Sequence, residues 1–239
     1  MYFRPLPRFT AFCIPLFLAL IALGVWQLDR LQWKLGLIAE MNAHLNAPAV
    51  SLNRMLQLTR PDGTEYRHVA LTGRFDNADE AYVYATDDNG APVYHLIVPF
   101  SLDDGRVVLV DRGIIPLPLK NPATRRAGVL DGEQRVVGVW VTPGLPGLFT
   151  PQPDLKQRVW YVRDVDGIAR RFGLTLAAPV VVEADPTPVP GGWPKGGQTV
   201  VVLRNDHLQY AITWFLLAAS LVVVYFAYHR AQGRLGLRR

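Results

Sequence analysis

A histidine and several aromatic and basic residues mark the start of an apolar run near the C-terminal end of the chain. His207, Tyr210 and Trp214 recur at spacings that place them on one face of a helix, just after Arg204. An imidazole nitrogen can ligate haem iron, and an arginine can pair with a haem propionate. An interfacial histidine that caps the helix or contacts lipid headgroups fits the same spacing. The spacing alone leaves both interpretations open.

A second group of such residues closes the apolar run near the N-terminus. Trp26, Arg30 and Trp33 stand at i, i+4 and i+7, so a helix would hold the arginine between two aromatic rings. Arg30 and Lys34 would lie at about the same level in the membrane as His207, near enough to pair with the propionates of a haem bound there. The alternative is an interfacial belt of tryptophans with a snorkelling arginine.

Two uncharged apolar segments set the positions of these groups. Residues 10–28 and 210–228 contain no Asp, Glu, Lys or Arg, and each is long enough to cross a bilayer. A cleaved signal peptide ending near Ala22–Gly24 is the alternative for the first, but the apolar run continues through Trp26. The predicted organisation is a tail at 1–9, a transmembrane helix at 10–28, an exported domain at 29–209, a transmembrane helix at 210–228 and a tail at 229–239.

The distribution of charge predicts the topology. The chain has 25 Lys and Arg against 20 Asp and Glu, and both tails contain arginine but no acid. Both termini should therefore be cytoplasmic and the main domain periplasmic, in a bacterial inner membrane. Because the excess positive charge belongs to the tails, the basic pI gives no support to nucleic-acid binding, and membrane lipid is the expected surrounding.

The region between the spans reads mainly as β-structure. A helix should continue from Asp29 to Leu45, and Asp166–Phe172 should form a short helix stopped by Gly173. Alternating or apolar patterns bounded by turns predict strands at 66–75, 81–85, 93–102, 107–114, 134–141, 179–183 and 199–203. The fold class is thus an α+β membrane protein: two transmembrane helices flanking an exported domain that is mainly an antiparallel sheet or open barrel.

Two segments rich in proline and glycine, 142–153 and 185–197, predict surface loops. Phe149 and Trp193 in these loops are either contact residues for a partner or packed loop aromatics.

Residue types that do chemistry elsewhere are sparse in this domain. The only cysteine, Cys13, lies in the first span, so there is no paired thiol for a metal. His68 and His95 fall in predicted strands, where histidines are usually satisfied by neighbours, and no hydrolase or phosphate-loop motif surrounds them. The protein is predicted not to be an enzyme. A tethered periplasmic enzyme using His95 or Asp111 is kept as a hypothesis that mutation would test.

Several segments together resemble the Surf-one (Surfeit locus protein one) family of cytochrome c oxidase assembly factors. The residues that carry the resemblance are 24–34 (GVWQLDRLQWK), 66–75 (YRHVALTGRF), 98–100 (VPF), 110–116 (VDRGIIP) and 205–214 (NDHLQYAITW). They cover nearly the whole chain in order.

The resemblance implies a role in maturing the largest subunit of a haem-copper oxidase, at the step where haem a is delivered or inserted. It implies that haem a is bound transiently, with His207 as the iron ligand and Arg204, Tyr210, Trp214, Trp26, Arg30 and Lys34 around it. The largest oxidase subunit and haem a synthase are the implied partners. The alternative is a haem-free scaffold that holds these partners during assembly.

Overall fold

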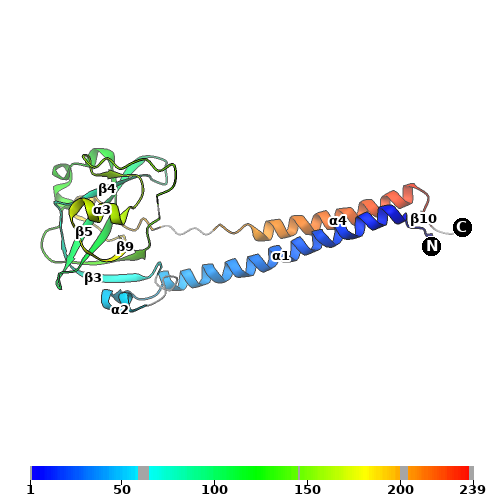
Figure 1. The fold of residues 1–239 in the computed structure, drawn as a ribbon, viewed down its shortest axis with the longest axis horizontal. Coiled ribbons are helices and arrows are strands. Elements are labelled where there is room, and N and C mark those ends of the chain that lie inside the picture. Colours follow the sequence, from blue (N-terminus) through cyan, green and yellow to red (C-terminus); the bar gives the residue numbers. More distant parts are fainter. Residues whose placement is uncertain (1, 59–64, 145, 200–203, 237–239) are drawn as a thin grey trace. The chain divides into compact units, whose positions relative to one another are not determined.

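The computed structural model describes residues 2–58, 65–144, 146–199 and 204–236. It divides into two units, one formed by residues 1–40 and 202–239 and the other by residues 41–201. The first is helical and the second is built mainly of strands (Figure 1).

Two long apolar helices make up the first unit. Helix α1 spans Pro7–Leu45 and helix α4 spans His207–Ala231, and both are long and apolar enough to cross a membrane. At 1.5 Å per residue α1 is about 58 Å long, roughly twice the hydrocarbon thickness of a bilayer. A helix that continues beyond the first apolar run, as far as Leu45, is therefore confirmed.

Pro15 lies well inside α1. A proline in the first turn of a helix costs little, because the donor that it lacks would have no partner there. Because α1 already begins at Pro7, Pro15 lies inside the helix and removes a backbone hydrogen bond there. Membrane helices tolerate such a proline when neighbouring groups satisfy the freed carbonyl.

Small residues let α1 and α4 lie side by side (Figure 1). Ala211 and Ala218 on α4 are each 1% exposed, although most of that helix is exposed. Gly24 on α1 faces the ring of Phe215, and an added Cβ would lie 2.6 Å from it. Close approach of this kind is how helices associate in lipid, where burial of apolar surface gives no net gain.

The two ends of the chain pair with each other beyond the helices. Strand β1 (Tyr2–Phe3) runs antiparallel to β10 (Leu235–Gly236). His229, fully buried, receives the Leu6 N–H on Nε2 at 3.1 Å, and its Nδ1 lies 2.8 Å from the Tyr225 carbonyl. Both imidazole nitrogens thus contact backbone groups. These contacts join the start of α1 to the end of α4.

The second unit contains an eight-stranded sheet. Its strands are β2 (Val50–Ser51), β3 (His68–Phe75), β4 (Ala81–Thr86), β5 (Pro92–Leu102), β6 (Val107–Pro116), β7 (Gln134–Val141), β8 (Val159–Trp160) and β9 (Leu176–Ala184). Their order is β2-β3-β7-β9-β6-β5-β4-β8. An additional pairing of β3 with β5 closes β3, β7, β9, β6 and β5 into a barrel. The mainly antiparallel β domain is confirmed, with β6 and β9 as a parallel pair.

A glycine permits the closure. Gly73 on β3 pairs with Leu102 on β5, and a Cβ at position 73 would overlap the Ser101 carbonyl oxygen. Since that oxygen belongs to the backbone, no side-chain rotation can relieve the clash. Closure then lets core side chains such as Val69, Leu71 and Phe100 pack in one buried cluster inside the sheet.

Helix α3 (Val165–Phe172) confirms the short helix read from the sequence. Asp164 accepts the Gly167 amide as its cap, and Gly173 ends the helix with a φ of 67°. Helix α2 (Leu52–Gln57) was not predicted, because six residues are too few to show a helical period. The strand predicted at 199–203 falls almost wholly outside the described residues.

The two loop aromatics have different environments. Trp193 packs against a buried cluster that includes Tyr82, Leu96 and Ile115, so it is a packed loop aromatic. Phe149 is 97% exposed and its neighbour Leu148 is fully exposed. Of the two, only Phe149 is available as a contact residue.

Candidate functional site

His207 is the first residue of α4 and is half-buried against α1. Its Nδ1 lies 2.8 Å from Oε1 of Gln27. If the amide oxygen is the partner, Nδ1 carries the proton and the lone pair is on Nε2, which has no hydrogen-bond partner among the described residues. A hydrogen bond that fixes the tautomer is the usual support of a metal-ligating histidine.

Gln27 is the member of this site that sequence reasoning missed. It is an uncharged polar residue at the end of an apolar segment, next to Trp26. Its position on α1 gave one signal, because a polar residue on the buried face of a membrane helix usually has a polar partner. The partner, however, lies 180 positions along the chain, and only folding brings it close.

Arg30 lies between two tryptophan rings, as the helical spacing predicted. Its guanidinium carbon is 5.8 Å from the ring of Trp26 and 5.4 Å from the ring of Trp33. Trp26 and Trp33 are 49% and 58% exposed and Arg30 is exposed as well, so all three side chains are accessible to surrounding molecules. The arrangement fixes a positive charge on α1, within one turn of Gln27.

The remaining predicted site residues are spread along the two helices and the segment just before α4. Arg204 forms an ion pair with Asp206, and its side chain is 86% exposed. Asp206 occupies the N-cap position, but its carboxylate is bonded to Arg204 and makes no capping hydrogen bond. Tyr210 is exposed and Trp214 is half-buried, and the latter lies about 10 Å along α4 from His207. Lys34 is half-buried, about 10 Å beyond Gln27 on α1.

A separate apolar groove of about 320 Å³ lies in the same helix pair. It is lined by Thr10, Cys13, Ile14, Phe17, Leu18, Leu221, Val222, Tyr225 and Phe226. Tyr225 is 18 residues from His207, about 27 Å along α4, so the groove is not part of the histidine site.

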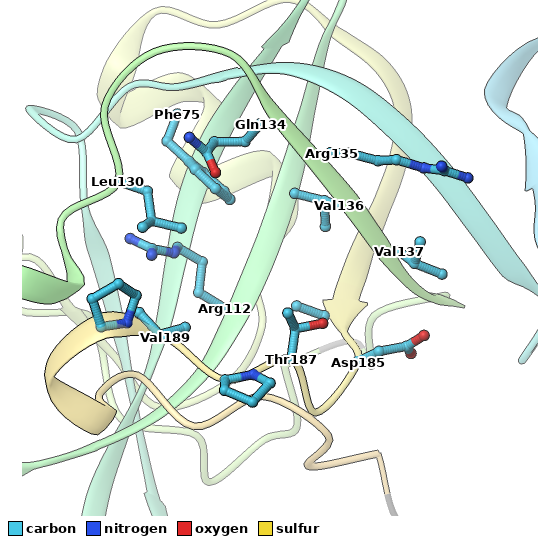
Figure 2. A pocket seen from close by; sticks show the side chains of 13 residues that line it. Phe75, Arg112, Leu130, Gln134, Arg135, Val136, Val137, Asp185, Thr187 and Val189 are labelled. Carbon is cyan, nitrogen blue, oxygen red and sulfur yellow. The ribbon is translucent and has the colours of Figure 1, made fainter.

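The β domain holds a more enclosed cavity of about 240 Å³ (Figure 2). Its wall is mostly apolar, from residues such as Leu130, Val136 and Val189, and includes the side chain of Arg112. Arg112 is 4% exposed, and its guanidinium lies 4.5 Å over the ring of Phe75.

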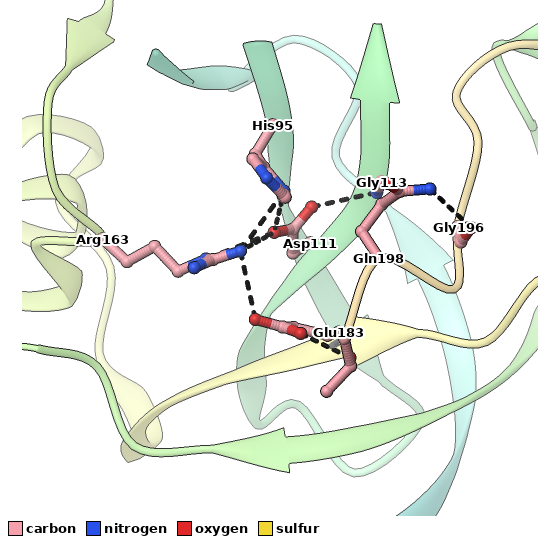
Figure 3. A network of polar contacts seen from close by, with 8 residues as sticks. His95, Asp111, Gly113, Arg163, Glu183, Gly196 and Gln198 are labelled. Atoms are coloured by element: carbon pink, nitrogen blue, oxygen red, sulfur yellow. Dashed lines mark hydrogen bonds and ion pairs between the residues drawn. The ribbon is translucent and has the colours of Figure 1, made fainter. Parts of the chain in front are cut away.

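A buried polar network joins β5, β6 and β9 (Figure 3). Nδ1 of His95 is 2.8 Å from Oδ2 of Asp111, and Arg163 reaches both Asp111 at 3.2 Å and Glu183 at 3.1 Å. Burial opposes ionisation of Asp111, but His95, Arg163 and the Gly113 amide outweigh it, so the pKa of this carboxyl lies below its usual range. The prediction that His95 is satisfied by its sheet neighbours is confirmed.

This network ties the loop containing Arg163 to the barrel. Among the described residues, His95 forms side-chain hydrogen bonds with Asp111 and Arg163 only. His68 is likewise paired, with Asp185 at 3.1 Å. In the described part of the chain, no three His, Cys, Asp or Glu side chains gather as a metal site would require.

Comparison with known proteins places the chain in a family. The sequence profile of the SURF1 family matches residues 14–219, which is most of the chain. The chain belongs to the SURF1 family. Surfeit locus protein 1 of Rattus norvegicus is 34% identical over 223 residues, covering 85% of this chain and 70% of the rat protein.

Other relatives match the chain over nearly their full length. Surfeit locus protein 1 of Takifugu rubripes is 34% identical over 86% of this chain and 90% of its own length. The SURF1-like protein of Rickettsia bellii is 32% identical over 92% of this chain and 90% of its own length. The SURF1 match runs from within α1, through the β domain, to within α4, so it includes Gln27, Arg112 and His207. Resemblance to the Surf-one family is thereby confirmed, and the two apolar helices fit a membrane protein.

Proposed function

We propose that this protein assists assembly of a haem-copper cytochrome c oxidase by holding haem a as cargo for the largest subunit. Membership of the SURF1 family supports a role in oxidase assembly in general. The finer assignment to haem a rests on one observation, the Gln27–His207 hydrogen bond, which leaves Nε2 of the imidazole available as a ligand.

The surrounding residues have the types that a haem site uses. His207 would supply the axial nitrogen, and Gln27 would orient its ring. Arg30, Lys34 and Arg204 provide cations for propionates, although Arg204 would have to exchange its Asp206 partner. Tyr210 and Trp214, with Trp26 on α1, offer aromatic surface for a flat apolar ring. Because most of these side chains are exposed or half-exposed, the cargo would be held loosely, as a transfer protein requires.

The proposed topology puts this site at the periplasmic surface of the inner membrane. With the arginine-rich tails in the cytoplasm, Gln27 and His207 lie where the two spans leave the bilayer on the periplasmic side of a bacterial inner membrane. Haem a synthase would supply the cargo and the oxidase subunit would receive it. No step of this role requires the protein to act as an enzyme.

The test compares haem retention in matched histidine variants. The full chain is co-expressed with a haem a synthase and purified, and its haem is measured by absorption spectroscopy. His207→Ala should lower the retained haem at least fivefold, and Gln27→Ala should lower it less, because it disturbs only the orientation of the ligand. His44→Gln, which changes a histidine bonded to the Glu65 carbonyl, should change nothing. Equal haem in His207→Ala and the unaltered protein would remove the ligand assignment.

A haem-free scaffold is the second candidate function, and one exposed loop favours it. Leu148 and Phe149 project almost completely into solvent, which is unusual for large apolar side chains and typical of contact sites. A photo-crosslinking residue at 149 should then capture the oxidase subunit or haem a synthase even in cells that make no haem a. Capture only in the presence of haem a would favour the carrier over the scaffold.

A further inference from the structure

The cavity in the β domain contains a buried cation that the proposed function does not use. Arg112 follows Asp111 on β6, and its side chain joins the wall of the cavity (Figure 2). Its Nη2 donates to the Gly128 carbonyl at 2.8 Å. Its Nη1 is shielded from water and has no hydrogen-bond partner in the described part of the chain. An unpaired buried donor of this kind destabilises a fold, and more so when it is charged.

Among the described residues, Arg112 also forms no ion pair with an acidic side chain. Glu80, a buried acid that acts electrostatically on Arg112, is already paired with Arg125 and receives the Tyr82 hydroxyl at 2.6 Å. Burial first, and then repulsion from Arg125, lower the pKa of Arg112 to about 10, partly offset by Glu80. Arg112 is therefore still charged at neutral pH, and the cluster of Glu80, Arg112 and Arg125 has one more positive charge than negative. A buried excess charge is stable only with a counter-charge or strong hydrogen-bond acceptors nearby.

The other residues of the cavity wall indicate what kind of molecule would carry this counter-charge. Apolar side chains such as Leu130, Val136 and Val189 make up most of the cavity wall, which also includes the polar residues Gln134 and Thr187. Asp185 also lines it, but its carboxylate is engaged by His68 at 3.1 Å, and Arg135 adds an exposed positive charge at the rim. At about 30 Å³ per small group, a volume of about 240 Å³ accommodates about eight non-hydrogen atoms.

We propose that this cavity binds a small monocarboxylate with an apolar body of about four to six carbons. The carboxylate accepts the N–H groups of Arg112 Nη1, and the carbon chain lies against Leu130, Val136 and Val189. Because Nη1 is shielded in the described structure, a small shift of the side chains that cover it accompanies binding. The site is in the β domain and is independent of the histidine site on the helices, so either assignment can fail without the other.

The test is a calorimetric titration of the full chain in a neutral detergent at pH 7. Hexanoate has eight non-hydrogen atoms and should bind saturably at one site per chain. Hexanamide has the same size but no charge, and it should bind at least tenfold more weakly, which also controls for partition into detergent micelles. Absence of saturable hexanoate binding, or equal affinity for the two compounds, would overturn the proposal.

Variants locate the binding. Arg112→Gln should weaken hexanoate binding at least tenfold, whereas Arg126→Gln removes an exposed positive charge from the same region and should leave it unchanged. Because Arg112→Gln can disturb folding, Leu130→Trp is a second test of the site. The tryptophan fills the cavity but leaves Arg112 in place, so this variant should not bind hexanoate. Circular dichroism checks that each variant is folded. Unchanged affinity in folded Leu130→Trp would show that hexanoate binds elsewhere and would refute the assignment.

Discussion

Replacing Glu80 by glutamine should destabilise the β domain strongly, because it leaves the buried Arg125 without its acidic partner. Glu80 and Arg125 have side chains that are each 2% exposed, and they form a direct ion pair. Removing one member of a buried pair typically lowers the free energy of unfolding by about 3–5 kcal/mol, because the other charge stays buried. Repulsion between Arg112 and Arg125, which Glu80 now offsets, acts in the same direction.

Urea unfolding of the full chain in detergent, followed by tryptophan fluorescence, measures this effect. With a urea dependence of about 2 kcal/mol per M, a loss of about 4 kcal/mol moves the unfolding midpoint down by about 2 M. Asp104→Asn is the matched control, because it breaks an ion pair with Arg106 whose members are substantially exposed. It should change the midpoint little.

A double variant separates the charge effect from the loss of packing. Glu80→Leu combined with Arg125→Met replaces the pair by apolar side chains, and its midpoint should lie closer to that of the unaltered protein than the midpoint of Glu80→Gln does. A midpoint for Glu80→Gln within about 0.3 M of the unaltered protein would refute the reasoning, since that shift corresponds to less than about 1 kcal/mol.

Three further predictions concern other parts of the fold. Because the pKa of Asp111 is lowered in the folded state, its ionised carboxylate stabilises the fold fully above the ordinary pKa of about 3.9, and this stabilisation is lost as the pH falls through the folded-state pKa. Acid unfolding followed by circular dichroism should show the loss. In Asp111→Asn this dependence of stability on pH should be weaker. Gly73→Ala should lower the free energy of unfolding by about 1–3 kcal/mol in the urea assay, because the added Cβ would clash with Ser101. Gly36→Ala is the control and should not lower it, because the space around that Cα is open. Equal effects of the two substitutions would argue against the barrel closure. His229→Ala should leave the Leu6 amide without its acceptor, so hydrogen exchange of that amide should accelerate at least fivefold, and an unchanged rate would contradict the contact.

Local patterns predicted the individual elements well. The helix through Leu45, the short helix at Val165–Phe172 and the strands from His68 to Val141 follow from periods of 3.6 or 2 and from turn residues. The stacking of Arg30 between Trp26 and Trp33 was also predictable, because all three are on one helix. In each case the interacting residues are close in sequence, so spacing alone determines their geometry.

Contacts between distant segments were not predictable in this way. Closure of the barrel depends on β3 meeting β5, and nothing in either strand specifies that partner over another. Gln27 looked like the last polar residue of an apolar run until α4 placed His207 beside it. Arg112 was predicted only as one residue of a strand motif. Packing alone shows that its side chain is buried and that Nη1 has no hydrogen-bond partner among the described residues.

The sequence by itself therefore determined two apolar helices, a β-rich domain between them and a histidine at the entrance to the second helix. Tertiary structure alone decided which imidazole nitrogen is available, which buried charges are paired and where the barrel closes. The physical reason is that periodicity reports only which face of an element is buried, whereas a hydrogen bond or ion pair needs two particular atoms within about 3 Å. For residues such as Gln27 and His207, 180 positions apart, only the folded chain fixes that distance.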